Sequence, residues 1–152
     1  MEKFLENLQE AEKIIQRMDH MIYVTFPLMK DKRLLLKIIL ETKIAITKSI
    51  NSILQYEYLY KRISLYKESK TNFRTFQKQC APRYEITKQE IKLISELFDI
   101  VEKHKQSPFE FMRNEKVIIL SENLTPKALT IENAKEFLLL AKDLLRKTKK
   151  QF

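Results

Sequence analysis

The sequence predicts an all-α or mainly α protein: a single-domain helical bundle of five to six helices built on a long antiparallel hairpin. Three observations support this prediction. The 152 residues include no glycine, where average usage of about 7% would supply roughly ten. Apolar residues recur at steps of three and four along most of the chain. With 44% hydrophobic and 32% charged residues, the chain has the composition of one folded domain of ordinary size.

The first two helices form the predicted hairpin. A helix over residues 2–25 has an apolar stripe that consists of Phe4, Leu8, Ala11, Ile15, Met18 and Ile22. Pro27 is expected to end this helix, because its ring clashes with the preceding turn. A second helix over residues 31–62 begins with Asp31 as its N-cap. At 1.5 Å per residue it measures roughly 48 Å against roughly 36 Å for the first, so its far end should overhang the hairpin.

Capping patterns locate the next two helices. After a polar stretch, Ser69 or Thr71 is expected to cap a short helix. The apolar residues of that helix are Phe73, Phe76 and Cys80. Thr87 and Glu90 have the spacing of a capping box, in which each side chain bonds the backbone N–H of the other residue. The box predicts that a longer helix starts at Thr87.

The remaining third of the chain mixes helix and strand patterns. Ser107 followed by Pro108 repeats the cap and predicts a short helix that ends near Arg113. Two apolar runs flank a polar stretch over residues 117–130, which predicts a small β-hairpin. A last helix over residues 131–148 follows. Its predicted buried face consists of Ala134, Phe137, Leu138, Ala141, Leu144 and Leu145.

The absence of glycine also excludes several functional motifs. Phosphate-binding loops of the types G-x-x-x-x-G-K-[ST] and G-x-G-x-x-G need a residue without Cβ, and the nucleophile elbow and the EF-hand loop have the same requirement. No apolar run approaches the ~20 residues that span a bilayer, so no membrane partner is expected. The acidic N-terminal residues lack the apolar core of a signal peptide, and a single cysteine fits a reducing compartment. We therefore expect a cytoplasmic protein.

Few residues are available for metal or nucleophilic chemistry. One cysteine and two histidines cannot form a Cys-rich zinc site, and neither histidine completes a Glu-x-x-His motif. A site that combines both histidines with distant carboxylates is the weaker alternative. Cys80 shares a helical face with Phe73 and Phe76, so we interpret it as a small core residue rather than a nucleophile. The sequence predicts no cofactor, no metal site and no catalytic residues.

The basic charge indicates a polyanionic partner. The net charge is +9, with 29 basic and 20 acidic residues, and the excess lies in the middle and at the tail of the chain. Tyrosines alternate with cations over residues 56–83, a pattern typical of single-stranded RNA recognition, where bases stack on rings and phosphates pair with cations. The tail over residues 147–150 is a weaker candidate. The predicted nucleic-acid-binding residues are Tyr58, Lys61, Arg62, Tyr66, Lys67, Lys70, Arg74, Lys78 and Arg83.

Two other interpretations of this segment stay open. Tyr56 and Tyr60 would continue the core stripe while the lysines form a solvated face. Lysine accounts for 22 of the 29 basic residues, a bias that an A/T-rich genome produces without any polyanion partner. Alternatively, the tyrosines and arginines form the centre of an obligate homodimer or of an interface with a protein partner. RNA binding is the preferred hypothesis and protein interaction is the runner-up.

Arg17 and His20 lie on one face of the first helix, three residues apart. A long central helix packed on an antiparallel neighbour, in a small Lys- and Ile-rich helical chain, resembles the HEPN superfamily of helical-bundle proteins, many of them RNases. The resemblance implies dimerisation through the bundle and an RNA partner. The catalytic signature of that superfamily places more residues between arginine and histidine than the two found here, so no catalytic residue is carried over. A metal-independent RNase that uses this pair is the third hypothesis.

Overall fold

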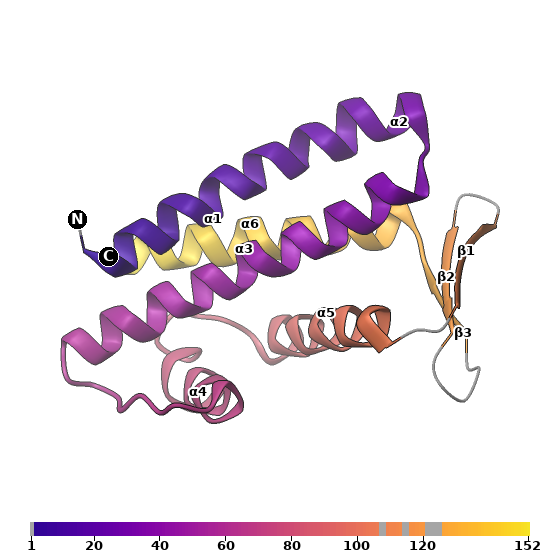
Figure 1. Ribbon diagram of the computed structural model, residues 1–152. Helices are drawn as coiled ribbons and strands as arrows, with labels where there is room; N and C mark the ends of the chain where they lie inside the picture. Colours follow the sequence, from indigo (N-terminus) through magenta and orange to yellow (C-terminus); the bar gives the residue numbers. More distant parts are fainter. Residues whose placement is uncertain (1, 107–108, 114–115, 121–125) are drawn as a thin grey trace.

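The computed structural model has the predicted mainly α fold with a small antiparallel sheet (Figure 1). The residues that it describes are 2–106, 109–113, 116–120 and 126–152. Four long helices form the bundle: α1 (Lys3–His20), α3 (Lys32–Leu59), α5 (Lys88–Gln106) and α6 (Ile131–Gln151). α1 runs antiparallel to α3 as predicted, whereas α6 runs in the same direction as α3. α5 packs against α3 and α6.

The first helix continues through Pro27, contrary to the prediction that this proline ends it. α1 passes into a π turn, η1 (Met21–Thr25), and then into the short helix α2 (Phe26–Met29). The backbone N–H of Phe26 donates to the carbonyl of Met21, five residues back. This wider turn changes which carbonyls face the proline ring, so Pro27 fits without the clash expected in a regular α-helix.

Helix α3 forms the centre of the bundle and begins where the sequence predicts. The Asp31 carboxylate accepts a hydrogen bond from the backbone N–H of Arg33 at 2.8 Å, as an N-cap does. Near the other end, the Ser52 hydroxyl donates to the carbonyl of Phe4 at 2.6 Å, so the start of α1 is level with Ser52. The last turns of α3 therefore extend beyond α1 (Figure 1), which confirms the predicted overhang.

Helix α4 (Ser69–Thr75) is the short helix predicted after α3, and a π turn, η2 (Phe76–Cys80), extends it. The predicted caps, Ser69 or Thr71, are wrong, because the helix has Glu68 as its N-cap, without a side-chain cap hydrogen bond. The two apolar residues predicted within η2 are fully buried. α4 and η2 together fold back beneath the end of α3 (Figure 1).

The capping box predicted at the start of α5 is confirmed. The backbone N–H of Thr87 donates to the Glu90 carboxylate at 2.9 Å, and the backbone N–H of Glu90 donates to the Thr87 hydroxyl at 3.1 Å. The buried residues of α5 are Ile94, Leu97, Ile100 and Val101. Their spacing places one face of the helix against α3 and α6.

A three-stranded antiparallel sheet follows α5, in the order β1–β2–β3. Its strands are β1 (Phe109–Arg113), β2 (Lys116–Leu120) and β3 (Pro126–Leu129). β2 and β3 lie in the predicted hairpin region. The short helix predicted to end near Arg113 is wrong, because that segment pairs with the β-branched strand β2, and strand pairing outweighs a weak local helix preference. The predicted cap at residues 107–108 lies outside the described residues.

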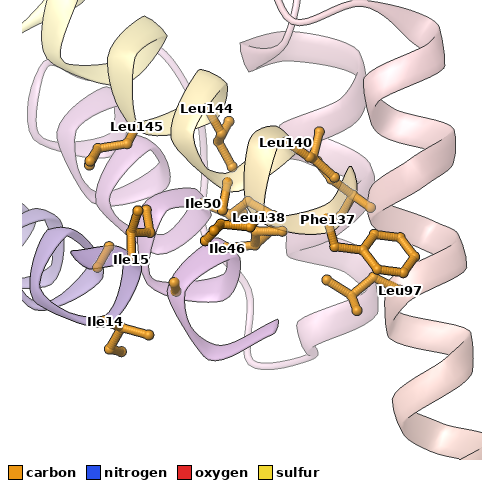
Figure 2. Packing of buried hydrophobic residues seen from close by; sticks show 14 of the residues in the cluster. Ile14, Ile15, Ile46, Ile50, Leu97, Phe137, Leu138, Leu140, Leu144 and Leu145 are labelled. Carbon is orange, nitrogen blue, oxygen red and sulfur yellow. The ribbon is translucent and has the colours of Figure 1, made fainter. Parts of the chain in front are cut away.

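The core lies where the four long helices meet. Figure 2 shows apolar side chains of one buried cluster, contributed by α1, α3, α5 and α6, among them Ile15, Ile46, Leu97 and Leu138. All six residues of the predicted apolar face of α6 are buried. Thr130 caps this helix by accepting a hydrogen bond from the backbone N–H of Asn133 at 3.2 Å.

Candidate nucleic-acid interface

The nine residues predicted to bind nucleic acid belong to the end of α3 and to the segment that follows it, which folds back along α3 (Figure 1). They belong to the last turns of α3, the connection over residues 60–68, α4, η2 and the turn after η2. The structure divides them into four groups. Tyr58 and Lys61 line a hollow at the end of α3, and Lys70 and Arg74 line a groove between α3, α4 and α5. Arg62 and Arg83 pair with a buried carboxylate. Tyr66, Lys67 and Lys78 are exposed between these sites.

The hollow at the end of α3 has a volume of about 510 Å³. Tyr58 and Lys61 line it together with Phe4 and Ile63. The Tyr58 side chain is 56% exposed, and Lys61 follows the helix with a left-handed φ of +60°. An aromatic ring and an ammonium group therefore line the same hollow. Proteins that bind single-stranded nucleic acids combine these two groups.

The Asn72 side chain joins the connection over residues 60–68 to α4. The backbone N–H of Tyr66 donates to Oδ1 of Asn72 at 2.8 Å, and Nδ2 of Asn72 donates to the Tyr66 carbonyl at 2.8 Å. This pair of bonds fixes the main chain of Tyr66 against α4 while its ring remains 56% exposed. Lys67 next to it and Lys78 on η2 are also exposed.

A larger groove, with a volume of about 600 Å³, lies between α3, α4 and α5. Lys70 and Arg74 line it from α4, where their spacing of four places them on one face. Lys43 of α3 and Lys105 of α5 line the other walls. The apolar residues that line the groove are Ile50, Leu54, Phe73, Phe98 and Val101. The groove therefore combines an apolar lining with cations from three helices.

Sequence reasoning missed the contribution of α3 and α5 to this groove. Lys43, Thr47 and Asn51 follow one another at steps of four along a helix that is otherwise largely apolar, and all three line the groove. This polar stripe is a signal that the sequence contains. Lys105 carries no comparable signal, because its place in the groove depends on how α5 packs against α3.

A buried carboxylate holds two of the predicted cations. The Glu57 side chain, near the end of α3, is only 2% exposed. One of its oxygens lies 2.8 Å from the guanidinium of Arg62, and the other lies 3.5 Å from Nε of Arg83. The Tyr84 hydroxyl donates to the carboxylate at 3.4 Å. Hydrogen bonding to Glu57 raises the pKa of Arg62, and the two cations together compensate a buried charge.

Cys80 lies beside this cluster and is fully buried. Burial, together with the nearby Glu57 carboxylate, raises the pKa of its thiol to about 12. The thiol is therefore protonated at neutral pH, whereas the thiolate is the nucleophilic form. These observations agree with the interpretation of Cys80 as a core residue.

Helix α6 shows a different arrangement of cations. Lys147 lies 2.5 Å from the Glu90 carboxylate, and Lys149 lies 2.5 Å from that of Glu12. Lys150 is 3.9 Å from Glu85. The tail over residues 147–150 is the weaker candidate from the sequence. Each of its lysines has an acidic partner.

The cations predicted to bind nucleic acid contrast with these. In the part of the chain that the structure describes, five of the predicted residues have no carboxylate within 4 Å. These five are Lys61, Lys67, Lys70, Arg74 and Lys78. These five cations thus form no ion pair with a described carboxylate, while one acidic residue lies in each region: Glu2 at the hollow, Glu68 in the connection and Glu102 at the groove.

The other candidate residues are not assembled into a site. Arg17 and His20 lie in the last turn of α1 with exposed side chains. Among the residues described here, no cluster of three or more His, Cys, Asp or Glu side chains has an arrangement that could hold a metal ion. Within the same residues, no helix combines the length and apolarity needed to cross a membrane.

Comparisons of the chain with family models, with curated proteins and with solved structures found no match. The resemblance to the HEPN superfamily therefore stays a prediction. The geometry of the site is the basis for a functional proposal.

Proposed function

We propose that this protein binds single-stranded RNA, or another single-stranded nucleic acid, through one basic surface. The surface runs from the hollow at the end of α3, across the connection over residues 60–68, to α4 and η2. The observation that supports it most directly is the set of five cations without an acidic partner. The residues of this basic surface are Tyr58, Lys61, Tyr66, Lys67, Lys70, Arg74 and Lys78.

Electrostatics gives the proposal its physical reason. Cations that repel one another without acidic partners destabilise the compact state slightly, whereas a phosphate backbone compensates them and releases its own counterions. Arg62 and Arg83 are outside the proposed surface because Glu57 already occupies their guanidinium groups.

The exposed rings supply the second element. Tyr58 and Tyr66 are each 56% exposed; Lys61 lines the same hollow as Tyr58, and Lys67 follows Tyr66 directly in the sequence. Large aromatic side chains are costly to leave in water, and stacking a base on one contributes about 1–3 kcal/mol without sequence preference. In a complex, the exposed rings would stack on bases and the nearby cations would contact phosphates.

Fluorescence anisotropy of a labelled RNA oligonucleotide tests the proposal. Five phosphate contacts to a single strand predict a slope of log affinity against log salt of about −3.5 between about 50 and 200 mM. The double variant Lys70→Glu and Arg74→Glu should weaken binding at least about tenfold. Its matched control, Lys13→Glu with Lys37→Glu, makes the same change of net charge at exposed positions on α1 and early α3.

Equal losses in the two double variants would mean that only net charge matters, and would overturn the basic surface. No binding of the unmodified protein at low salt would reject nucleic-acid binding altogether. Circular dichroism of each variant checks that the fold is retained.

A protein partner or a second copy on the same end is the alternative, and one observation favours it. Leu59 is 51% exposed between the exposed rings of Tyr58 and Tyr60, and aromatic residues are enriched at interface centres. Light scattering separates the two functions. A dimer that dissociates when Leu59 is replaced by Ser, with RNA affinity unchanged, would support the alternative.

A further inference from the structure

We propose that the groove between α3, α4 and α5 binds one nucleotide unit, with the base on its apolar lining and the phosphate against Lys70 and Arg74. The inference rests on the proposed function and deepens it, because it names where on the basic surface a base is held. A groove of this kind would also accept a free mononucleotide, which makes it separately testable.

The size and lining of the groove suit a base. Its volume of about 600 Å³ lies within the range of roughly 300–1,000 Å³ found for small-molecule pockets. Phe73 and Phe98 both line it, with ring centroids 5.4 Å apart and planes tilted by 53°. A planar base that stacks on one of these rings and contacts the edge of the other would remove apolar surface from water and gain stacking contacts.

The charges of the groove suit a phosphate. Lys43, Lys70, Arg74 and Lys105 all line it, and Glu102 is the one acidic residue among the described lining residues. The Lys43 ammonium already lies 5.6 Å from the ring centroid of Phe98, a cation–π contact that keeps a positive charge beside the lining. Lys70 and Arg74 stand one turn apart on the same face of α4, so one phosphate can contact both.

Side-chain amides complete the set of groups that a base requires. Asn51 and Gln77 line the groove, and carboxamides both donate to and accept from base edges. Asn72 also lines it, but its carboxamide is engaged with the backbone of Tyr66. That engagement joins the wall of the groove to the exposed ring of Tyr66, where a neighbouring base of the strand would lie.

The test follows amide chemical shifts of the labelled full chain by NMR during titration with adenosine 5′-monophosphate, adenosine, inorganic phosphate and a short RNA oligonucleotide. We expect the mononucleotide to shift the amide signals of Asn51, Gln77 and Phe98. Asn51→Asp places a carboxylate at an exposed position of the groove and should weaken mononucleotide binding about tenfold or more. The matched control, Gln16→Glu, adds the same charge at an exposed position on α1 and should leave binding unchanged.

A second variant tests the base separately from the phosphate. Phe98→Leu keeps an apolar side chain but removes one ring, and should weaken the mononucleotide about tenfold while leaving inorganic phosphate unaffected. If phosphate alone reproduces the shifts and the affinity of the mononucleotide, the groove recognises no base and the inference is overturned.

The remaining outcomes separate the inference from the proposed function. An oligonucleotide that binds with a steep salt dependence but shifts only signals around Tyr58 and Lys61 would overturn the inference and leave the proposed function standing. A mononucleotide that shifts the groove signals, with no binding of the oligonucleotide, would support the groove as a nucleotide site and reject single-strand binding.

Discussion

Helix α6 and the segment over residues 58–83 contain similar numbers of cations, six and seven respectively, but their surroundings differ. On α6, each lysine and arginine has a partner: five pair with carboxylates, and Lys135 lies over the ring of Tyr23 at 5.4 Å. In the segment over residues 58–83, only Arg62 and Arg83 have a carboxylate within 4 Å among the described residues. Similar charge therefore serves packing in one region and is available to a ligand in the other.

The comparison shows why net charge is a poor guide to a binding surface. Four of the five acids that pair with α6 cations come from α1, from α5 and from the turn before α5, up to 137 residues away in the sequence, and only Asp143 belongs to α6 itself. The five unpaired cations, by contrast, lie at the end of α3 and on the segment that follows it, where the described carboxylates pair only with Arg62 and Arg83.

The largest expected effect comes from converting paired cations into unpaired ones. Glu57→Gln should lower the free energy of unfolding by about 2 kcal/mol, because a buried charged acceptor is lost to two guanidinium groups. The same change releases Arg62 and Arg83, so RNA affinity of the folded protein should rise. Urea unfolding and anisotropy measure the two effects, with Glu136→Gln at an exposed position of α6 as control. Lower affinity in a folded Glu57→Gln protein would contradict the comparison.

The next largest effect is expected when one lysine in each region is replaced by glutamate. Lys147→Glu should cost about 1–2 kcal/mol of stability, since it places a second carboxylate against Glu90 in a half-buried pair. Lys70→Glu should change stability by less than about 0.5 kcal/mol. RNA affinity should respond in the opposite order. Thermal unfolding and binding of the two variants give the result, and identical behaviour would erase the distinction between the regions.

The pH dependence of stability isolates one pair on α6. Burial raises the pKa of Glu90, but hydrogen bonds from Lys147 and from the backbone of Thr87 outweigh it and lower the pKa below the ordinary value of 4.5. A lowered folded-state pKa contributes stability that is present above about 4.5 and is lost as pH falls through the folded-state value. Glu90→Gln should therefore lose less stability than the unmodified protein between about pH 5 and 3. Parallel acid-unfolding curves would show that the pair contributes nothing.

The smallest effect is expected when a single cation without an acidic partner is removed. Lys67→Ala should leave the unfolding midpoint unchanged, because no carboxylate contacts Lys67 in the described chain. It should reduce the magnitude of the salt slope for single-stranded RNA by about 0.7, the contribution of one phosphate contact. A shifted midpoint would reveal a structural role for this lysine.

Much of the helical architecture could be predicted because its determinants are local. Thr87 with Glu90 and Asp31 with the following backbone form caps within one helical turn, and apolar periodicity marks the buried face of α6. Errors occurred where a distant partner decided the outcome. Phe109–Arg113 forms a strand because β2 pairs with it, and the π turn before Pro27 carries the helix past the proline.

The sequence by itself determined that the chain is helical, basic, free of glycine-dependent motifs and rich in tyrosine and cations over residues 56–83. The tertiary structure decided which of those cations are available. Glu57 neutralises Arg62 and Arg83, while Lys43 and Lys105 join Lys70 and Arg74 in one groove. The physical reason is that capping and periodicity act within a few residues, whereas the partner of a charge and the walls of a groove come from helices far apart in the chain.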